Sequence, residues 1–380
     1  MFPVFSREYM STERRPSLAL IACLLLWIGL LVFGLWPFDF FPRNKVHWVD
    51  NGPGMVFDHY GQVYSLDRWS LQPSQAQGPT KFSFEFWLTP QAGYETFGTI
   101  LCVCSSRGQS DLIVAESGPD LVVVGHFRER DGTSALHYLW YDGAAMTGER
   151  RFVTMTSGPK GTVLYLDGKP LRPDRYQDLL PENYSGQLLI GHSPSGEQGW
   201  RGIVRGLALY DRVLSAQEVA IHYGLWQEND MEPLKTARAL YTFEEESGNV
   251  IRNRAASSAP DLLIPQTFRR FRPEWLDFPH PLKRSDIRDA IVNIMGFIPF
   301  GFCFFLYLRI TRDFSPARAL WCAVLIGGVT SLAIEISQVF LPSRDSSALD
   351  LINNIIGSIA GSALALFALS QRIVGARSSK

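Results

Sequence analysis

The sequence has almost no excess of charge of either sign, because 36 lysine and arginine residues stand against 37 aspartate and glutamate residues. The formal net charge of the chain is therefore −1. Nucleic-acid-binding domains carry a strong positive charge that neutralises phosphates. The composition gives no reason to expect a nucleic-acid partner.

Cysteine is scarce as well, with 5 residues in a chain of 380. Three of these, Cys23, Cys303 and Cys322, fall within long apolar runs. Cys102 and Cys104 are two positions apart, so on a strand they face the same side, where the geometry of a disulfide is hard to meet. We expect no disulfide framework, and a domain of this size does not need one.

The motifs of common catalytic sites are missing too. The sequence contains no nucleophile elbow, no HExxH zinc motif and no phosphate-binding loop. We therefore expect a protein without covalent catalysis, and we assign no catalytic residue, no metal ligand and no cofactor.

The chain does have four apolar runs, each long enough to cross a membrane as a helix of about 20 residues. They cover Leu18–Trp36, Ala290–Leu308, Leu320–Leu341 and Leu351–Leu369. The first is longer than the apolar core of a signal peptide, about 7–15 residues, and it ends in bulky side chains where a cleavage site needs small ones. We interpret it as a retained membrane span.

Basic residues in the short segments around the spans predict the orientation, because such residues concentrate on the cytoplasmic side. They occur in the N-terminal tail, in the loop after the second span and in the C-terminal tail, at Arg7, Arg14, Arg15, Arg309, Arg312, Arg318, Arg372, Arg377 and Lys380. We predict an integral protein of the inner (cytoplasmic) membrane with both termini in the cytoplasm. The basic segment RRFRPEWLDFPHPLKRSDIR would then lie outside, and long loops translocate largely regardless of their charge.

Between the first and second spans the pattern changes to that of β-strands. In KFSFEFWLTP, the three phenylalanines and the leucine point to one side and the residues between them to the other. Asp167-Gly168 is a turn pair that accepts positive φ angles. Ser215 and Glu218 have the spacing of a capping box at the start of a helix. Many short strands separated by turns indicate an antiparallel sandwich or jelly roll.

The sequence thus predicts a multidomain α + β fold, in which an antiparallel β-sandwich is inserted between helices 1 and 2 of a four-transmembrane-helix bundle. The predicted segments are a cytoplasmic tail at 1–16, a span at 17–41, the extracytoplasmic sandwich at 46–265, a juxtamembrane linker at 266–288, three spans at 289–370 and a cytoplasmic tail at 371–380.

The stretches FSFEFWLTP, RRFVTMTSGPKGTVLYLDGKP and LLIGHSPSGEQGWRGIVRGLALYDRVLSAQEVAIHY resemble successive signatures of laminin-G-like (concanavalin A-like) jelly rolls. This resemblance implies two large curved sheets that bind a glycan or a protein. Glycan hydrolases need two facing carboxylates, and alternating acidic residues such as Glu-x-Asp-x-x-Glu do not occur. We expect a lectin or scaffold rather than a glucanase. A calcium site on the jelly roll stays open, since no Asp/Asn cluster marks one.

Polar residues interrupt the last three spans at helical spacing, so that each helix has one polar face. Under the predicted topology they meet at the outer leaflet, and facing one another is cheaper than facing lipid. The sequence predicts an outward polar pocket formed by Asp289, Asn293, Glu335, Gln338, Arg344, Asp350, Asn353 and Asn354. Helix packing is assigned to Pro299, Gly301, Gly357 and Gly361, of which the last two form a small-xxx-small pair.

The prediction of a pocket depends mainly on Glu335. Asp289 and Asp350 begin their helices, where the helix dipole favours a negative charge. Glu335 lies near the C-terminal end of its helix, where the dipole disfavours one, so it needs protonation or a cation such as Arg344. The alternative is that all these residues only join the helices, by hydrogen bonds worth about 0.6–2 kcal/mol each.

The stretches WPFDF, DAIVNIMGFIPFG and EISQVFLPSRDSSALDLINNIIGSIAG resemble the motifs of VanZ-like bacterial membrane proteins, over Leu18–Phe41 and about 285–369. The motif positions include every pocket and packing residue named above except Asn353 and Gly361. The resemblance implies a four-helix membrane protein, and the founding member is linked to resistance against a lipid-anchored glycopeptide antibiotic. The first outer loop is short in the family, whereas in this sequence it would be interrupted by the jelly roll.

Together these features predict a bacterial envelope protein whose jelly roll binds a glycan or protein and whose pocket binds a lipid head group or lipid-linked saccharide. Such a protein would affect glycopeptide resistance or envelope polysaccharide handling. Two alternatives stay open: an intramembrane enzyme that acts on a lipid-linked saccharide, with Glu335 or Asp350 as general base, and a small transporter. A transporter fits less well, because the polar groups gather at one leaflet. The sequence does not indicate the oligomeric state.

Overall fold

The computed structural model describes residues 14–70, 81–91, 97–105, 111–128, 133–145, 148–171, 180–181, 184–278 and 284–378. Residues 1–13 and 379–380 of the predicted tails and residues 279–283 of the predicted linker lie outside these ranges. The chain divides into two compact units, of which one combines Met1–Phe40 with Glu274–Lys380 and the other is Phe41–Pro273.

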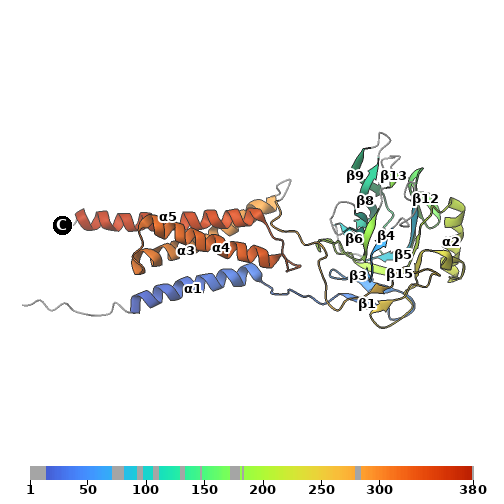
Figure 1. Cartoon of the computed structure of the whole chain (residues 1–380), viewed down its shortest axis with the longest axis horizontal. Coiled ribbons are helices and arrows are strands. Elements are labelled where there is room, and N and C mark those ends of the chain that lie inside the picture. Colours follow the sequence, from blue (N-terminus) through green and yellow to red (C-terminus); the bar gives the residue numbers. More distant parts are fainter. Residues whose placement is uncertain are drawn as a thin grey trace, which may run out of the picture. The chain divides into compact units, whose positions relative to one another are not determined.

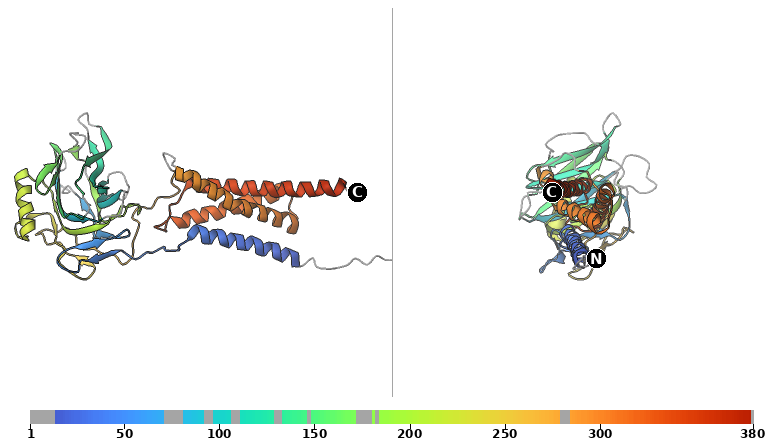
Figure 2. Two further views of the ribbon diagram at one scale, coloured as in Figure 1. Left: turned by 180° about the vertical axis from the view of Figure 1, so that it is seen from behind. Right: turned by 90° about the vertical axis from the view of Figure 1, so that its left-hand side faces the viewer.

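The first unit is built from four long helices, α1 (Arg14–Leu35), α3 (Arg284–Thr311), α4 (Pro316–Gln338) and α5 (Ala348–Ser378). They run alongside one another (Figure 1, Figure 2). In the described part of the chain, these 4 helices are long and apolar enough to cross a membrane. The protein is therefore a membrane protein, as the sequence predicted.

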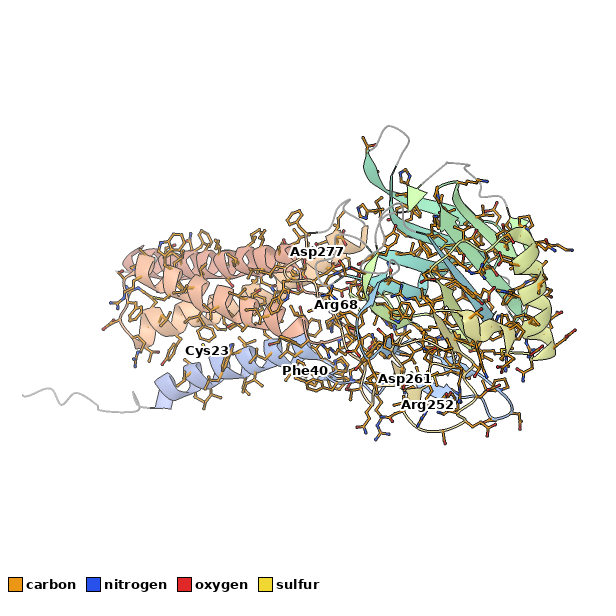
Figure 3. The ribbon with its side chains drawn as sticks, turned by 45° about the vertical axis from the view of Figure 1, so that its right-hand side comes forward. Cys23, Phe40, Arg68, Arg252, Asp261 and Asp277 are labelled. Carbon is orange, nitrogen blue, oxygen red and sulfur yellow. The ribbon has the colours of Figure 1, made fainter. Side chains whose placement is uncertain are left out.

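Helix α1 packs against the other helices through a few close contacts. Its Gly34 approaches Ile334 on α4 so closely that a Cβ atom would lie 2.8 Å from the Ile334 side chain. The indole nitrogen of Trp27 donates a hydrogen bond to Thr330 Oγ1 at 3.0 Å. Cys23, labelled in Figure 3, is buried. These contacts attach α1 to α4 on one side of the bundle.

The second unit is a sandwich of two antiparallel sheets, which confirms the predicted fold class. In spatial order and within the described residues, the first sheet comprises β1 (Val46–Trp48), β2 (Met55–Phe57), β15 (Gly202–Tyr210), β5 (Phe82–Pro90), β10 (Arg151–Gly158), β11 (Gly161–Leu166) and β12 (Lys169–Leu171), with β16 (Ala239–Tyr241) beside β15. The second comprises β13 (Leu180–Pro181), β8 (Asp120–Arg128), β7 (Leu112–Ser117), β6 (Gly98–Cys104), β14 (Ser185–Ile190), β3 (Val63–Ser65), β18 (Leu262–Leu263) and β17 (Val250–Ile251), with β4 (Trp69–Ser70) beside β14 and β9 (Ser134–Tyr141) beside β8.

The core of the sandwich lies between the sheets and follows the alternation in the sequence. Phe82, Phe84 and Phe86 of β5 point into this core and are almost completely buried. The helix α2 (Ala216–Glu228) begins at the capping box of Ser215 and Glu218, and it lies on the outside of the first sheet (Figure 1). A short 3-10 helix, η1 (Pro233–Thr236), follows it.

The second unit reaches further along the chain than the predicted sandwich at 46–265. Arg43 forms a bridge with Thr267, and Asn44 N donates to Gln266 O at 3.1 Å. Beyond these, Arg272 pairs with Asp111 at 2.5 Å. Residues 266–273 therefore pack as part of the domain, whereas the sequence assigned them to the linker.

His192 makes the stability of this domain depend on pH. It is 0% exposed and packs on Phe268, with ring centroids 4.5 Å apart. Burial lowers the pKa of His192 to about 3, whereas an unfolded histidine titrates near pH 6.5. Between these values the unfolded state binds the extra proton, so the free energy of unfolding falls by about 1.4 kcal/mol for each pH unit of acidification.

We expect the stability advantage of wild type over the His192→Gln variant to shrink by about 2–3 kcal/mol between pH 7 and pH 4.5. Thermal and urea unfolding of the full chain in detergent, followed by tryptophan fluorescence, would measure it. The exposed His47 on β1 is the control position, since His47→Gln should show no such trend. An advantage independent of pH would show that His192 is not buried in its neutral form.

Candidate functional site

The residues of the predicted pocket lie at one end of the helical bundle, where α1 and α4 end and α3 and α5 begin. We call them the polar cluster, which comprises Asp289 and Asn293 of α3, Glu335 and Gln338 of α4, Arg344 of the α4–α5 loop, and Asp350, Asn353 and Asn354 of α5. Contacts described below join side chains or backbone groups of all four helices at this end.

Glu335 is 2% exposed and lies in the last turn of α4. Its Oε2 atom accepts a hydrogen bond of 2.7 Å from the backbone N–H of Ser347, directly before α5. The Ser347 hydroxyl in turn accepts from Asp350 N at 3.3 Å, as an N-cap does. The positive end of the α5 dipole thus faces a carboxylate that its own helix disfavours.

Arg344, which the sequence offered as the cation beside Glu335, makes a different contact. Its Nε atom donates to the carbonyl oxygen of Trp36 at 3.1 Å. Trp36 follows directly after α1, so Arg344 connects the α4–α5 loop to the end of the first span. The described hydrogen-bond partner of Glu335 is a backbone amide at a helix start.

Carboxyl groups of three helices approach one another in the cluster. The side chain of Asn293 on α3 is hydrogen-bonded to Asp350 on α5. Asp289 and Asp286, one and two turns before Asn293, are close enough to Asp350 to interact with it electrostatically. Asp350 also interacts electrostatically with Glu335. The structure therefore brings the predicted acidic residues together, and it adds Asp286.

The depth of these side chains differs. Glu335, Gln338, Asn353 and Asn354 are buried, Asn293, Arg344 and Asp350 are half-buried, and Asp289 is exposed. The cluster thus extends from the surface of the first unit, at α3, into the interface between α4 and α5.

Three buried amide groups of the cluster are only partly satisfied. Gln338 Nε2 donates to Gly34 O at 2.8 Å, and Asn354 Nδ2 donates to Ser331 Oγ at 2.9 Å. The other atom of each amide, Gln338 Oε1 and Asn354 Oδ1, has no hydrogen-bond partner in the described part of the chain, and neither does Asn353 Nδ2. An unpaired buried group costs about 1–3 kcal/mol, so these atoms mark a place where a ligand or water is needed.

Three of the four predicted packing residues lie along the crossing of α3 and α5. A Cβ atom at Gly361 would lie 2.0 Å from Ile298 O, and one at Gly357 would lie 2.4 Å from Ile294 O. From the other helix, a Cβ atom at Gly301 would lie 2.2 Å from Ser358 O. The fourth, Pro299, is inside α3, and its side chain is exposed. The two backbones are therefore in direct contact just below the cluster.

A short segment before α3 pairs with the loop that leads into α5. Asp277, labelled in Figure 3, donates through its backbone N–H to Ser346 O at 2.9 Å and accepts from Ala348 N at 3.0 Å. The side chains of Trp275 and Phe340 pack edge to face, with ring centroids 5.8 Å apart. Exposed aromatic residues gather at this end of the bundle, namely Trp36, Phe38, Trp275, Phe278 and Phe340, which is typical of a membrane–water interface.

Several members of this site were not predicted from the sequence. Ser347 could have been found, because Ser347 and Asp350 have the spacing of a helix-start motif before an apolar run. Asp286 could have been found by extending the polar face of α3 by one turn. Ser331 lies four residues before Glu335, so helical spacing places it on the same polar face of α4, although it was not assigned to the pocket. Thr330 carries no such signal, since threonine is common in membrane helices.

The sandwich contains a buried acidic group that the sequence analysis did not single out. Glu85 of β5 is 0% exposed and accepts hydrogen bonds from Tyr210 OH at 2.9 Å and Trp226 Nε1 at 3.2 Å. His222 Nδ1 lies 2.7 Å from its other oxygen. Because His222 and Trp226 belong to α2, Glu85 attaches this helix to the first sheet.

Residues 237–369 match the family described as VanZ/LLP1, and residues 67–220 match the Concanavalin A-like lectin/glucanases superfamily. The chain thus contains a VanZ-like domain and a concanavalin A-like domain. The VanZ-like match begins inside the second unit, just before β16, and runs through the last three spans, so it includes every residue of the polar cluster. No curated protein matches the chain.

The chain is also similar to solved structures. One is a putative carbohydrate binding protein from Bacteroides ovatus (12% identity, 58% of this chain and 58% of that chain, TM-score 0.38). Another is a SAP-like pentraxin from Limulus polyphemus (12% identity, 47% and 79%, TM-score 0.31). A third is a sialidase from Trypanosoma rangeli (16% identity, 48% and 29%, TM-score 0.35). The chain spans about half the length of several structures that it resembles.

Proposed function

We propose that the VanZ-like bundle binds a lipid head group or a lipid-linked saccharide at its polar cluster, and that the concanavalin A-like domain binds a glycan or protein of the cell envelope. The observation that carries the first part is the set of buried, unpaired atoms Gln338 Oε1, Asn353 Nδ2 and Asn354 Oδ1. Native proteins pair almost all such atoms, and exceptions call for a ligand or an ordered water. The second part rests on the family match alone.

The position of the cluster along the helices supports a lipid ligand. It lies within the first or last turns of three membrane spans, which is the depth of the head-group region for helices of this length. The exposed Trp36, Trp275 and Phe340 at the same end agree with an interfacial position.

The order of the elements supports a joint function for the two units. The chain enters the concanavalin A-like domain after α1 ends and returns before α3 begins. With both termini in the cytoplasm, the domain and the polar cluster are on the outer side of the membrane. Joining two binding modules in one chain raises the effective concentration of a ligand that carries both a glycan and a lipid.

Replacing Asn353 with leucine tests the ligand site without removing a hydrogen bond that the structure shows. Leucine has a similar size and has no polar atoms to satisfy, so the bundle should be at least as stable as wild type. We expect the amount of bound lipid to fall at least about five-fold, which corresponds to ~1 kcal/mol. Native mass spectrometry of the full chain, extracted in mild detergent, would measure it.

The control is Ile352→Leu, one position away on the lipid-exposed side of α5. It should leave the bound lipid unchanged. Glu335→Gln is the second test variant, because it removes the charge and keeps an acceptor for Ser347 N. A bound-lipid profile that is the same in wild type, Asn353→Leu and Glu335→Gln would reject the head-group site and would favour the view that the cluster only joins the helices.

A further inference from the structure

We infer that the concanavalin A-like domain binds the head groups of anionic phospholipids through a basic face of its own. This face is formed by the two ends of the domain, residues 41–45 and 265–273, which connect it to the membrane helices and which we call the paired segments. It is separate from the polar cluster, so the inference does not depend on the ligand of that cluster.

The exposed side chains of the paired segments lie on one face. Arg43 and Thr267 form an antiparallel bridge, and Phe41 and Arg269 follow two positions further in the same direction along the pair. In 41–45 every second residue, Phe41, Arg43 and Lys45, is exposed, and the residues between them are buried or half-buried. Side chains two apart on an extended chain point to the same side, and cross-strand partners share that side.

Two amide side chains hold this arrangement from within the domain. The Gln62 side chain, which is 0% exposed, donates from Nε2 to Arg269 O at 3.1 Å and accepts from Arg269 N at 3.3 Å. Asn44, which lies between two basic residues, accepts from Gln62 N at 2.8 Å and donates to Pro265 O at 2.9 Å. One hydrogen-bonded network therefore fixes the backbone of both segments.

The paired segments contain five basic residues and no acidic residue. Two of the five serve the domain itself. Arg272 forms an ion pair with Asp111. The Arg270 side chain packs against Gly196, where a Cβ atom would lie 2.5 Å from the Arg270 Cγ atom. Neither is counted as part of the basic face.

The other three basic residues, Arg43, Lys45 and Arg269, are exposed. Within the described part of the chain, no acidic side chain forms an ion pair with any of them. The Arg269 guanidinium lies 5.0 Å from the centroid of the Phe271 ring, a contact that leaves its charge in place. These three side chains therefore present positive charge to the surroundings.

The acidic residues near this face have other partners or positions. Asp58 donates its backbone N–H to Lys45 O at 3.0 Å, but its carboxylate pairs with Arg201 at 2.6 Å. Asp39 and Glu274, the nearest acidic residues along the chain, lie just beyond the paired segments and belong to the other compact unit. The face thus attracts anions such as phosphate groups.

The connection to the helices indicates which phosphates these are. Arg43 lies eight residues after the end of α1 at Leu35. Arg269 lies eight residues before Asp277, which pairs with the α4–α5 loop. Because eight residues span at most about 28 Å, both cations are tethered within reach of the lipid head groups at one end of the bundle.

An exposed aromatic side chain on the same face also fits a membrane surface. Phe41 is 77% exposed, more than any other large apolar side chain in the residues that the structure describes. Aromatic residues are enriched where protein meets the head-group region. Basic residues gain affinity for an anionic bilayer only within about one Debye length of it, so the binding should depend on salt.

The test measures how fast lysines of the full chain react with an acetylating reagent, residue by residue, by peptide mass spectrometry. The protein is placed in nanodiscs of phosphatidylcholine, with or without an equal amount of phosphatidylglycerol. We expect acetylation of Lys45 to be at least about five-fold slower in the anionic nanodiscs. The rate should recover at about 0.5 M salt, where the Debye length falls below about 5 Å.

Lys160, exposed in the turn between β10 and β11, is the internal control and should react at the same rate in both nanodiscs, because it lies at the far end of the first sheet from Lys45. The double variant Arg43→Gln/Arg269→Gln keeps every backbone hydrogen bond of the paired segments and should lose most of the slowing at Lys45. Lys81→Gln/Lys169→Gln removes the same charge from exposed positions of the first sheet and should keep it.

Equal rates at Lys45 in the two nanodiscs would overturn the inference. Slowing of Lys45 and Lys160 to the same extent would also overturn it, because the domain would then have no preferred face. A third result would replace the lipid by a soluble phosphate polymer, namely slowing by inorganic polyphosphate in neutral nanodiscs without slowing by phosphatidylglycerol. The variant Asn353→Leu should behave as wild type here, so the result is independent of the lipid site in the bundle.

Discussion

Replacing Gly361 with leucine is expected to separate α5 from α3 and to lower the stability of the bundle by about 3 kcal/mol or more. A Cβ atom at this position would lie 2.0 Å from Ile298 O and 2.8 Å from Phe302 N. Both are backbone atoms of α3, so a rotamer change cannot relieve the overlap. The helices must move apart, and with them Asn293 and Asp350, which join α3 to α5 at the polar cluster.

Thermal unfolding of the full chain in detergent, read by circular dichroism at the helical wavelengths, would measure this effect. Gly29→Leu on α1 is the matched control, because nothing lies within 4 Å of a Cβ atom there. It should unfold at the temperature of wild type. If Gly361→Leu also does so, α3 and α5 do not cross at the distance that the structure shows.

Glu85→Ala is expected to destabilise the concanavalin A-like domain by about 3–5 kcal/mol, because it leaves buried donors without their acceptor. Tyr210, His222 and Trp226 all lose the carboxylate that they share. Glu85→Gln keeps an acceptor and should cost less. Since two of the three donors are on α2, this helix should loosen from the first sheet before the sandwich unfolds.

Hydrogen–deuterium exchange of the full chain would locate the effect. Protection should fall in Ala216–Glu228 first and should be unchanged in the four membrane spans. Glu228→Ala, an exposed glutamate at the end of the same helix, is the control and should change neither stability nor exchange beyond its last turn. If the exchange rates in α2 were equal in wild type and Glu85→Ala, Glu85 would not hold the helix on the first sheet.

Local chemistry in the sequence was sufficient for several elements. The alternation of KFSFEFWLTP predicted the strand that the structure shows at Phe82–Pro90. The capping box of Ser215 and Glu218 is present with both of its hydrogen bonds. Asp167 and Gly168 have φ angles of 51° and 77°, as a turn between two strands requires. Each of these depends on neighbours within a few residues, so the pattern of residue types is enough.

The sequence by itself also determined which face of each membrane helix is polar, because helical periodicity depends only on spacing. It could not determine what that face meets. Glu335 finds its partner in the backbone of Ser347, after the loop LPSRDSS folds back over the end of α4. Asn354 pairs one half of its amide with Ser331 and leaves the other half unpaired because no described group reaches it. Only the tertiary structure decides such contacts, since they follow from how the helices cross and where the loop brings the next helix start.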